Sequence, residues 1–412
     1  MAKTLKVKGR LAFRLFAVTS ADELLTEIGH GRYTTGGRAG DTYTVTVKDG
    51  AGAGTLAYGI ANAPEAGRTI LFAVNGTTDN QTIVTTKSNI TIDGSSAPGG
   101  GFCFRGRMTI QGSNWIIKNI RVRPGRQADP SINTHPIWFL SPTYGTNVHL
   151  KNFVLKNVSV TWGNDENVVF SGCSNITIQN CLIGEPIFDA FPPVYGSQSV
   201  SALGLYKCEN VTVYQNVFLA TRTPLAGGVK NVELINNVIF GYFSTPAINF
   251  SQEATHYPSS LANSMIKNIG LYSAIAQVRA IFGFLTGGSP YMTQVNNSSE
   301  VYRVGNKIDT SWVDGVLTLT DDFVSGDGSA VILPSEPITR SGVSDDALTV
   351  GADMLSTVLA KAGAILPSRD AVDTRLIGMI TDRASANLNE HATFYSAYLI
   401  DHEDDVGGFP TL

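Results

Sequence analysis

The most regular feature of this chain is a short segment of alternating apolar and other residues that returns six times between residues 89 and 237. Each copy opens with Asn, continues through residues rich in Val, Ile and Thr, and usually closes with a second Asn. Period-two alternation of β-branched residues predicts half-buried strands rather than helices. The opening residues are Asn89, Asn114, Asn152, Asn175, Asn210 and Asn231.

The spacing of these strands predicts a solenoid. The copies recur at roughly two dozen residues, with insertions, which is a period typical of stacked repeats. A single strand of this length cannot bury its apolar side, but strands stacked in parallel form one continuous core. We therefore predict an all-β fold, a single-stranded right-handed parallel β-helix in which each repeat forms one coil.

The closing asparagines fit the same prediction, because Asn tolerates the left-handed backbone and its amide can bond an Asn one coil away. A general preference for Asn in turns would explain one such residue, but a strand-final Asn recurs five times. The sequence therefore favours an amide ladder at one corner of the coil, formed by Asn119, Asn157, Asn180, Asn216 and Asn237.

The segments outside the repeats predict caps for this solenoid. Residues 20–29 carry an N-cap Ser, early acids and a closing Gly, so they predict a short helix, as do residues 54–60. Further helices are predicted within 344–362 and 370–380, packed back along the coil. We expect one domain (1–412), with an N-terminal cap region at 1–68, β-helix coils at 69–310 and a C-terminal flank at 311–412.

Composition narrows the kind of partner. The net charge of −4 gives no overall basic field of the sort that attracts nucleic acid. No segment is long and apolar enough to span a membrane, and the start of the chain lacks a clear export signal. We therefore expect neither a nucleic acid nor a membrane partner. An acidic ligand would meet local basic residues: Arg105, Arg107, Lys118, Arg121, Arg123 and Arg126.

The four cysteines are too few for a disulfide-built fold, and no Cys-x-x-Cys metal pattern occurs. Cys173 and Cys208 each lie two residues before an opening Asn, so they are expected to stack on adjacent coils within bridging reach. Cys is also a good small core residue, and buried free thiols are the favoured interpretation.

Charged residues of both signs follow the closing asparagines at similar distances along the chain. Stacking the coils would bring them to one side of the solenoid. Taken alone, Arg126 is best explained as a solvated loop residue. Taken together, the charges predict a groove that contains Arg126, Asp165, Glu166, Glu185 and Arg222.

Several longer motifs share an order along the chain. They are Thr34-Thr-Gly-Gly-Arg-Ala-Gly40, Thr91-Ile-Asp-Gly-Ser-Ser-Ala-Pro-Gly-Gly-Gly101, Asn119-Ile-Arg-Val-Arg-Pro-Gly125, Ser159-Val-Thr-Trp-Gly-Asn-Asp-Glu166, Gln179-Asn-Cys-Leu-Ile-Gly-Glu-Pro186, Arg222-Thr-Pro224, Arg369-Asp-Ala-Val-Asp-Thr-Arg375 and Val406-Gly-Gly-Phe-Pro410. From about residue 30 to its end, the chain resembles polysaccharide lyase family 1, the pectate lyases and their relatives.

That resemblance implies cleavage of an acidic polysaccharide, pectate or a related uronic acid polymer, by β-elimination. The C5 proton of a uronic acid is acidic enough only when the adjacent carboxylate is neutralised, so the site needs both a base and a cation. The resemblance implies that Arg222 is the base, although a guanidinium with a pKa above about 12 then requires alkali or neighbouring positive charge. It also implies a Ca²⁺ ion bound by Asp165, with Glu166 beside it.

The chain departs from the family pattern around this site. His135-Pro136 stands where relatives carry an acidic calcium ligand, and Lys156-Asn157 stands where many carry Asp-His. Basic side chains can replace calcium, as they do in the pectin lyase branch. We therefore expect the substrate to be bound by Arg121, Arg123, Arg126, Lys156 and Glu185, with a stacked column that supports the fold as the alternative for Arg121 and Arg123.

Three classes of function follow. The first is a pectate lyase-like enzyme, secreted by analogy with the family and more readily a monomer than a trimer. The second is a non-catalytic or weakly catalytic carbohydrate-binding β-helix, such as a virion-associated phage tailspike component. The third, a glycoside hydrolase with the same solenoid shape, needs paired carboxylates at set spacing and a Gly-His-Gly turn, and the sequence has neither.

Overall fold

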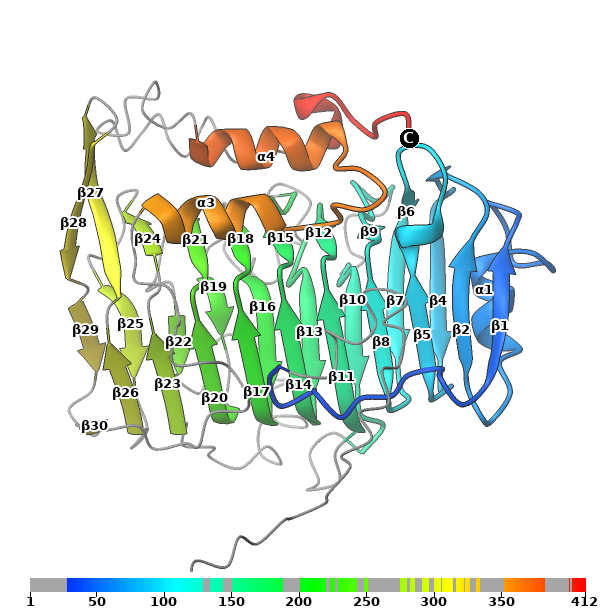
Figure 1. Ribbon diagram of the computed structural model, residues 1–412, viewed down its shortest axis with the longest axis horizontal. Helices are drawn as coiled ribbons and strands as arrows, with labels where there is room; N and C mark the ends of the chain where they lie inside the picture. Colours follow the sequence, from blue (N-terminus) through cyan, green and yellow to red (C-terminus); the bar gives the residue numbers. More distant parts are fainter. Residues whose placement is uncertain are drawn as a thin grey trace, which may run out of the picture.

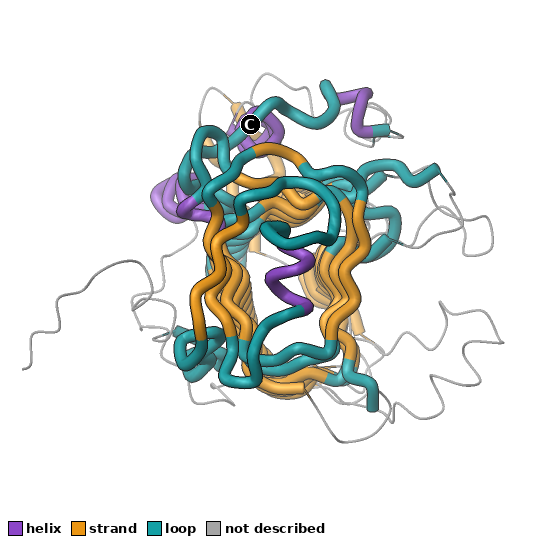
Figure 2. The backbone as a smooth tube through the Cα atoms, turned by 90° about the vertical axis from the view of Figure 1, so that its right-hand side faces the viewer, coloured by secondary structure: helices purple, strands orange, loops and turns teal. Residues whose placement is uncertain are grey.

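Three sheets wind around one elongated core in the computed structural model (Figures 1 and 2). A typical coil contributes one strand to each sheet, and strands one coil apart pair in parallel. The chain therefore has the predicted right-handed parallel β-helix fold. The structure describes residues 28–128, 134–143, 150–187, 201–219, 223–226, 229–242, 248–250, 275–279, 282–285, 291–295, 300–304, 306–313, 316–321, 323–326, 331–333, 352–381, 400 and 402–412.

We name the sheets A, B and C in the order in which a coil visits them. Sheet A contains β1 (Asp41–Val45), β2 (Arg68–Phe72), β5 (Ile90–Asp93), β8 (Trp115–Lys118), β11 (Leu150–Lys156), β14 (Cys173–Gln179), β17 (Cys208–Tyr214), β20 (Val229–Ile235), β23 (Ile275–Arg279), β26 (Glu300–Val304) and β30 (Val331–Leu333). Sheet B contains β3 (Gly76–Thr77), β6 (Phe102–Phe104), β9 (Arg121–Val122), β12 (Ser159–Thr161), β15 (Leu182–Gly184), β18 (Val217–Leu219), β21 (Val238–Tyr242), β24 (Phe282–Leu285), β27 (Lys307–Val313) and the antiparallel β28 (Val316–Asp321). Sheet C contains β4 (Gln81–Thr85), β7 (Gly106–Ile110), β10 (Ile137–Leu140), β13 (Val168–Ser171), β16 (Ser201–Tyr206), β19 (Thr223–Ala226), β22 (Ile248–Phe250), β25 (Tyr291–Val295) and β29 (Phe323–Gly326).

The Asn motif correctly located the middle of sheet A. Its six copies correspond to β5, β8, β11, β14, β17 and β20, and their Val, Ile and Leu side chains alternate into a continuous core. Aromatic residues join this core from sheet C, where Phe139 and Phe170 stack on adjacent coils with ring centroids 4.5 Å apart. The strands extend beyond the expected 69–310 at both ends, because β1 already pairs with β2 and β30 still pairs with β26.

The asparagine ladder lies at a different corner from the predicted one. Side-chain amides join the opening asparagines across successive coils, as in the bond from Asn114 Nδ2 to Asn89 Oδ1 (2.8 Å) and that from Asn175 Nδ2 to Asn152 Oδ1 (3.0 Å). The opening asparagines all have positive φ, which Asn tolerates. Among the five strand-final residues, the described amide-to-amide bond joins Asn216 to Asn237 (3.0 Å), so the expected continuous ladder was wrong.

The other strand-final asparagines have different roles. Asn119, Asn157 and Asn180 do take the left-handed conformation, with φ of 53°, 53° and 52°. However, the side-chain amide of Asn157 donates to the carbonyls of Lys361 and Gly363 in the C-terminal flank. Tertiary contacts from elsewhere in the chain therefore replace the bond to the next coil.

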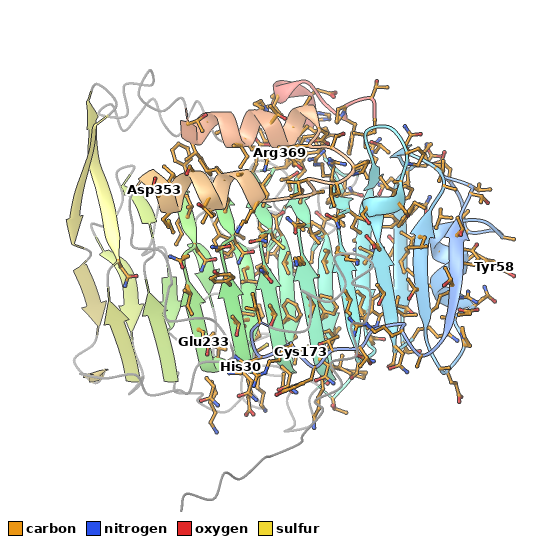
Figure 3. The ribbon with its side chains drawn as sticks, viewed as in Figure 1. His30, Tyr58, Cys173, Glu233, Asp353 and Arg369 are labelled. Atoms are coloured by element: carbon orange, nitrogen blue, oxygen red, sulfur yellow. The ribbon has the colours of Figure 1, made fainter. Side chains whose placement is uncertain are left out.

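A strap formed by residues 28–40 crosses the outer face of sheet A (Figure 1). Backbone amides of the strap donate to Thr side chains on separate coils: His30 to Thr212 (3.0 Å) and Gly31 to Thr177 (2.9 Å). Gly31 is required there, because a Cβ would lie 2.5 Å from the Phe153 carbonyl oxygen. Figure 3 labels His30 and Glu233. The Glu233 carboxylate accepts a hydrogen bond from the Thr212 hydroxyl (3.2 Å).

Short helices cover one end and one side of the β-helix. Figure 2 shows α1 (Leu56–Ala61), predicted at 54–60, inside the outline of the first coils, and Thr55 caps its N-terminus. Residues 20–27 of the other predicted cap helix lie outside the described residues, and 28–29 form a bend. Two further 3₁₀ turns are η2 (Gly94–Ser96) and η4 (Glu403–Val406).

The C-terminal flank packs along sheet B as predicted. Helices α3 (Ala352–Lys361) and α4 (Ala371–Thr381) run beside β12, β15, β18 and β21 (Figure 1). Their apolar residues form a second core with the outward side chains of these strands, including Leu182, Val217 and Phe240. None of the helices described here is long and apolar enough to cross a lipid bilayer.

All four cysteines are buried free thiols, as the favoured interpretation predicted. Burial is the main cause that raises the pKa of Cys103 to about 11 and that of Cys208 to about 12. These thiols therefore stay protonated and serve as small core residues.

Candidate functional site

The candidate site lies where the chain passes from sheet B to sheet C. His135 lies in the connection between β9 and β10, and Asp165 and Glu166 lie in the connection between β12 and β13. The register of the following strands pairs Ile137 with Val168, so His135 lies one coil from Glu166. Stacking of the coils therefore brings together residues that are about 30 positions apart.

Hydrogen bonds fix the shape of this corner. Asn164 Oδ1 accepts bonds from the Thr134 backbone amide (2.6 Å) and hydroxyl (2.8 Å), which ties the two connections together. The Gly163 amide donates to Asn167 Oδ1 (3.0 Å), and Asn167 Nδ2 donates to the Gly184 carbonyl one coil further (3.1 Å). The Asp165 and Glu166 backbone is thus held on both sides.

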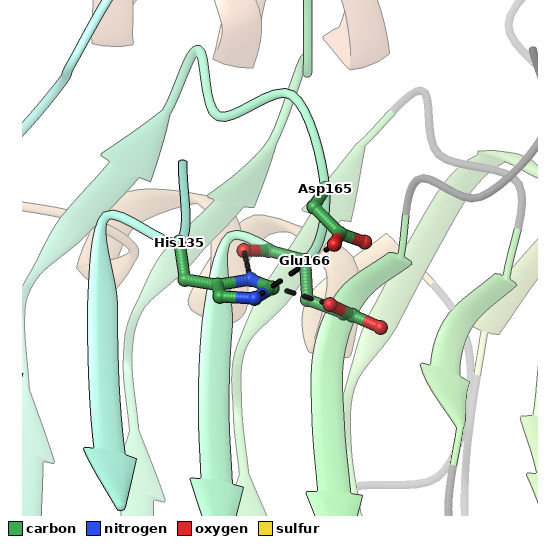
Figure 4. A group of neighbouring side chains, drawn as sticks. All are labelled: His135, Asp165 and Glu166. Atoms are coloured by element: carbon green, nitrogen blue, oxygen red, sulfur yellow. Dashed lines mark hydrogen bonds and ion pairs between the residues drawn. The ribbon is translucent and has the colours of Figure 1, made fainter. Parts of the chain in front are cut away.

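The imidazole of His135 faces the carboxylates of both Asp165 and Glu166 (Figure 4). Its Nε2 is 3.7 Å from Asp165 Oδ2, and its Nδ1 is 3.3 Å from Glu166 Oε2. One donor atom from each of the three residues can be chosen so that all lie within 4.8 Å of one another. All three side chains are largely buried, so the cluster has the composition and compactness of a metal centre.

Two aromatic residues hold this cluster in place. The Tyr206 hydroxyl, from β16, donates to Glu166 Oε1 at 2.5 Å. The Trp138 ring, from β10, contacts His135 edge to face with centroids 5.0 Å apart. Sequence reasoning treated His135 as the loss of a ligand and did not consider Tyr206. The Asn motifs step by 38 residues here, from Asn119 to Asn157, whereas the strands of sheet C step by 31, from Ile137 to Val168, so the motif spacing could not place His135 beside Glu166.

Two adjacent carboxyl groups determine the electrostatics of the described part of this corner. Burial, together with the neighbouring Glu166 carboxylate, raises the pKa of Asp165 well above its usual range. Two adjacent buried carboxylates repel each other unless a proton or a cation is shared between them. This arrangement is common at functional sites, where perturbed groups collect.

Arg121 and Arg123 are placed differently from the expected substrate site. Both are fully buried under the C-terminal flank, where Asp370 and Asp373 face them. Arg123 contacts both carboxylates at 2.6 Å, and Arg121 Nε lies 3.0 Å from Asp370 Oδ2. A polymer has no access to either guanidinium in this structure, which favours the alternative that both residues support the fold.

This buried cluster contains two arginines and two aspartates, so its positive and negative charges balance. Burial opposes ionisation of Asp370, but Arg123 and Arg121 more than offset it and lower its pKa. Burial raises the pKa of Asp373, although both arginines and a bond from the Ser159 hydroxyl (2.5 Å) favour its ionised form. The pair of cations and pair of anions form a closed network that joins β9 to α4.

Glu185 and Lys156 also lie apart from the candidate centre. The Glu185 carboxylate is buried and accepts two bonds from Arg375 of α4, both 2.7 Å long, and a third from Trp162 Nε1 (2.9 Å). Lys156 ends β11 in sheet A, in register with Lys118. Glu185 thus pairs with Arg375 of the C-terminal flank, whereas the sequence predicted that it binds the polymer.

Arg126 does lie in the connection from β9 to β10, and its side chain is half-buried. Its backbone amide donates to Glu403 Oε2 (2.7 Å), which fixes its position. Arg222 lies outside the described residues. Near Arg126, a polar cavity of about 110 Å³ is lined by Asn80, Gln81, Thr82, Gly106, Arg107, Pro124, Gln127 and Thr134.

The described donors around Asp165 do not form a calcium site. Ca²⁺ takes about six to eight oxygen ligands, including carbonyls and side-chain amides. Here Asn164 Oδ1 and Asn167 Oδ1 already accept hydrogen bonds, and the Glu166 carbonyl accepts from His135 at 3.2 Å. The third position at the centre is an imidazole, which is a ligand for softer ions.

Comparison with known proteins gives sequence relatives of one kind. The chain is 30% identical over 226 residues to a protein named probable pectate lyase C from Emericella nidulans, covering 52% of this chain and 46% of that protein. This match therefore spans less than half of the relative. A second match, to probable pectate lyase C from Aspergillus flavus, is 26% identical over 397 residues and covers 92% of this chain and 80% of that protein.

No model of a known protein family matches the chain. Among solved structures, that of a pectate lyase from Bacillus sp. N165 in complex with trigalacturonate aligns with 81% of this chain and 98% of its own. The sequence identity is 15% and the TM-score is 0.44.

Proposed function

We propose that this chain, whose sequence matches relate it to the pectate lyase superfamily, is a family 1 polysaccharide lyase. It would cleave polygalacturonate or a related uronic acid polymer by β-elimination. The observation that carries the proposal is the 26% identity to probable pectate lyase C, which extends over 92% of this chain. The polymer is extracellular, so we place the activity outside the cell, with one chain as the working unit.

In the proposed reaction Arg222 accepts the proton from C5 of a uronic acid unit. The electron pair of that C–H bond forms the C4–C5 double bond, the C4–O glycosidic bond breaks, and the departing oxygen takes up a proton. In chain order Arg222 falls between β18 and β19, the connection two coils after the one that holds Asp165. This placement supports a common groove along the corner between sheets B and C.

The substrate carboxylates require positive charge along this groove. Arg126 is a half-buried cation in the connection between β9 and β10, one coil before Asp165. Arg107 lines the polar cavity that ends at Thr134, next to His135. We assign this cavity to a neighbouring sugar unit, bound by Arg107 and by the amides of Asn80 and Gln127. Arg121, Arg123 and Glu185 are left out of the substrate site because their charges already face buried partners.

The test is the rise in ultraviolet absorbance that unsaturated products give when the purified chain is mixed with polygalacturonate. We expect turnover that increases into alkali, because Arg222 must lose a proton to act as a base. The Arg222→Ala variant should lose at least about 100-fold in rate, the range of a general base. Arg38→Ala, which removes an exposed arginine of the strap, is the matched control and should keep wild-type activity.

Unchanged activity of the Arg222→Ala variant would contradict the assignment of the base. Binding of the polymer by the wild-type chain without any unsaturated product, with or without added divalent ions, would instead support the carbohydrate-binding alternative.

A further inference from the structure

Trp162 has a backbone conformation that a bulky residue rarely adopts. Its φ is 66°, in the left-handed region, and its side chain is fully buried. Such a conformation persists only where the surrounding structure holds it. Trp162 directly follows β12 and precedes the turn that carries Asp165 and Glu166, so its backbone sets the direction in which both acids leave the strand.

Residues of the next coil and of the flank hold Trp162. Its backbone amide donates to the Glu185 carbonyl (3.0 Å), and its indole Nε1 donates to Glu185 Oε2 (2.9 Å). Arg375 of α4 fixes the same carboxylate with two bonds, both 2.7 Å long. The guanidinium of Arg123 lies over the indole, 5.3 Å from the ring centroid. The backbone, the polar edge and one face of Trp162 are thus fixed.

A residue of the C-terminal tail, residues 402–412, also packs against Trp162. The Phe409 ring meets the indole edge to face, with centroids 5.0 Å apart and the ring planes at 89°. Aromatic pairs prefer this geometry. The guanidinium of Arg105 lies over the Phe409 ring, 4.6 Å from its centroid. Phe409 therefore contacts two different connections from sheet B to sheet C.

A tight turn anchors the tail to the same corner. The Gly408 amide donates to the Glu403 carbonyl (2.8 Å), which closes the turn η4. Glu403 is buried, its Oε1 lies 3.8 Å from Arg105 Nη2, and its Oε2 accepts from the backbone amide of Arg126 (2.7 Å). The tail is therefore attached to three successive connections, which contain Arg105, Arg126 and Trp162.

We propose that Phe409 is a positioning residue of the proposed lyase site. Packed on Trp162, it stabilises the left-handed backbone there and so sets where Asp165 and Glu166 project into the groove. A displacement of about 1 Å in a catalytic site can cost about 100-fold in rate, so a residue outside the reacting groups can control the rate. The effect on catalysis rests on the proposed lyase function, whereas the effect on the turn does not.

Hydrogen exchange measured by mass spectrometry tests the turn without substrate. In Phe409→Ala the amide hydrogens of residues 162–167 should exchange about two- to tenfold faster, the factor that corresponds to the loss of one aromatic pair. Those of β14 should not change, which establishes that the variant is otherwise folded. Phe409→Tyr keeps the ring and should exchange like the wild type. Unchanged exchange at 162–167 in Phe409→Ala would overturn the proposal.

Lyase rates test whether the effect on catalysis acts through the turn. Phe409→Ala should lower kcat/KM for polygalacturonate at least about tenfold. In an Asp165→Asn background the same change should have an effect at least about threefold smaller, because the turn has then already lost one of the groups that it positions. Equal factors in the two backgrounds would mean that Phe409 only supports the fold, and would overturn the proposal.

Tyr58→Ala is the matched control. Tyr58 of α1 also makes a contact between rings, with the Tyr43 centroid 6.3 Å away, but it lies at the end of the β-helix (Figure 3). This variant should keep wild-type exchange at 162–167 and wild-type kcat/KM, and equal changes in both variants would overturn the proposal. Absence of unsaturated product with the wild type would instead refute the proposed function, and the exchange result would still decide whether the tail holds the turn.

Discussion

Two buried charge clusters, in neighbouring parts of the same coils, have opposite characters. The flank cluster, Arg121, Arg123, Asp370 and Asp373, contains two cations and two anions that contact one another at 2.6–3.6 Å. The corner cluster, His135, Asp165 and Glu166, contains two carboxylates and one imidazole. The first cluster thus contains as many cations as anions, whereas the described members of the second are two acids and one imidazole.

This difference indicates what each cluster does. A matched buried network needs no further partner, and it joins segments about 250 positions apart, so its role is to attach α4 to sheet B. The corner cluster brings two buried carboxylates together, which costs free energy unless a proton or a cation is shared between them. The buried counter-charges of Arg121 and Arg123 favour the alternative that these arginines support the fold, and Asp165 and Glu166 become the better candidates for chemistry.

The largest expected effect on the free energy of unfolding comes from removing one charge of the flank cluster. Asp373→Ala removes the partner of Arg123 Nη2 and leaves buried guanidinium charge uncompensated, so we expect a loss of about 3–5 kcal/mol in the free energy of unfolding. Denaturant unfolding followed by circular dichroism measures it. Exposed Glu65→Ala should change stability by less than about 0.5 kcal/mol.

Replacing an aspartate of the corner cluster with alanine tests whether the two clusters differ in their contribution to stability. Asp165→Ala in metal-free protein relieves repulsion with Glu166 and should cost far less than Asp373→Ala. Equal losses for the two variants would show that both clusters are structural.

A smaller effect on the free energy of unfolding is expected when the pH is lowered. The arginines lower the pKa of Asp370 below the value of about 3.9 that an unfolded chain has, so the unfolded state takes up the proton first. The stabilisation is present above that value and is lost as the pH falls through the folded-state pKa. Below about pH 4 the unfolding free energy of the wild type should therefore fall more steeply than that of Asp370→Asn, by up to about 1.4 kcal/mol per pH unit. Parallel curves for the two proteins would contradict the matched network.

The smallest effect is expected at Arg126, which is half-buried in the connection between β9 and β10. Arg126→Ala should raise KM for polygalacturonate about two- to fivefold at low salt and leave the unfolding free energy nearly unchanged. The difference in KM should shrink at high salt, because exposed charges are screened. A wild-type KM at low salt would remove Arg126 from the substrate site.

Much of the fold could be read from local pattern. The Asn motif gives the strands of sheet A, because alternation and left-handed asparagines are properties of neighbouring residues. The ladder was assigned to the wrong corner because five of the six strands carry Asn at both ends, and the contacts that distinguish the two ends, such as that of Asn157 with Gly363, come from distant segments.

The site was predictable only in part, for the same reason. Asp165 and Glu166 were found because they follow a closing Asn. Arg121 and Arg123 were left between substrate binding and support of the fold, because no local pattern links them to Asp370 and Asp373. His135 was presented by the family resemblance as a missing ligand, and its position beside Glu166 depends on the 31-residue step of the sheet C strands, which the 38-residue step of the Asn motif does not reveal.

The strap has a consequence for how the molecule comes apart. In a simple solenoid each repeat touches only the next, so a terminal coil can detach alone. Here residues 30–37 are bonded to Thr91, Asn114, Thr177 and Thr212, which belong to four different coils. Loss of an end coil must therefore release the strap as well, and this section of the helix should resist proteases and heat as one cooperative unit.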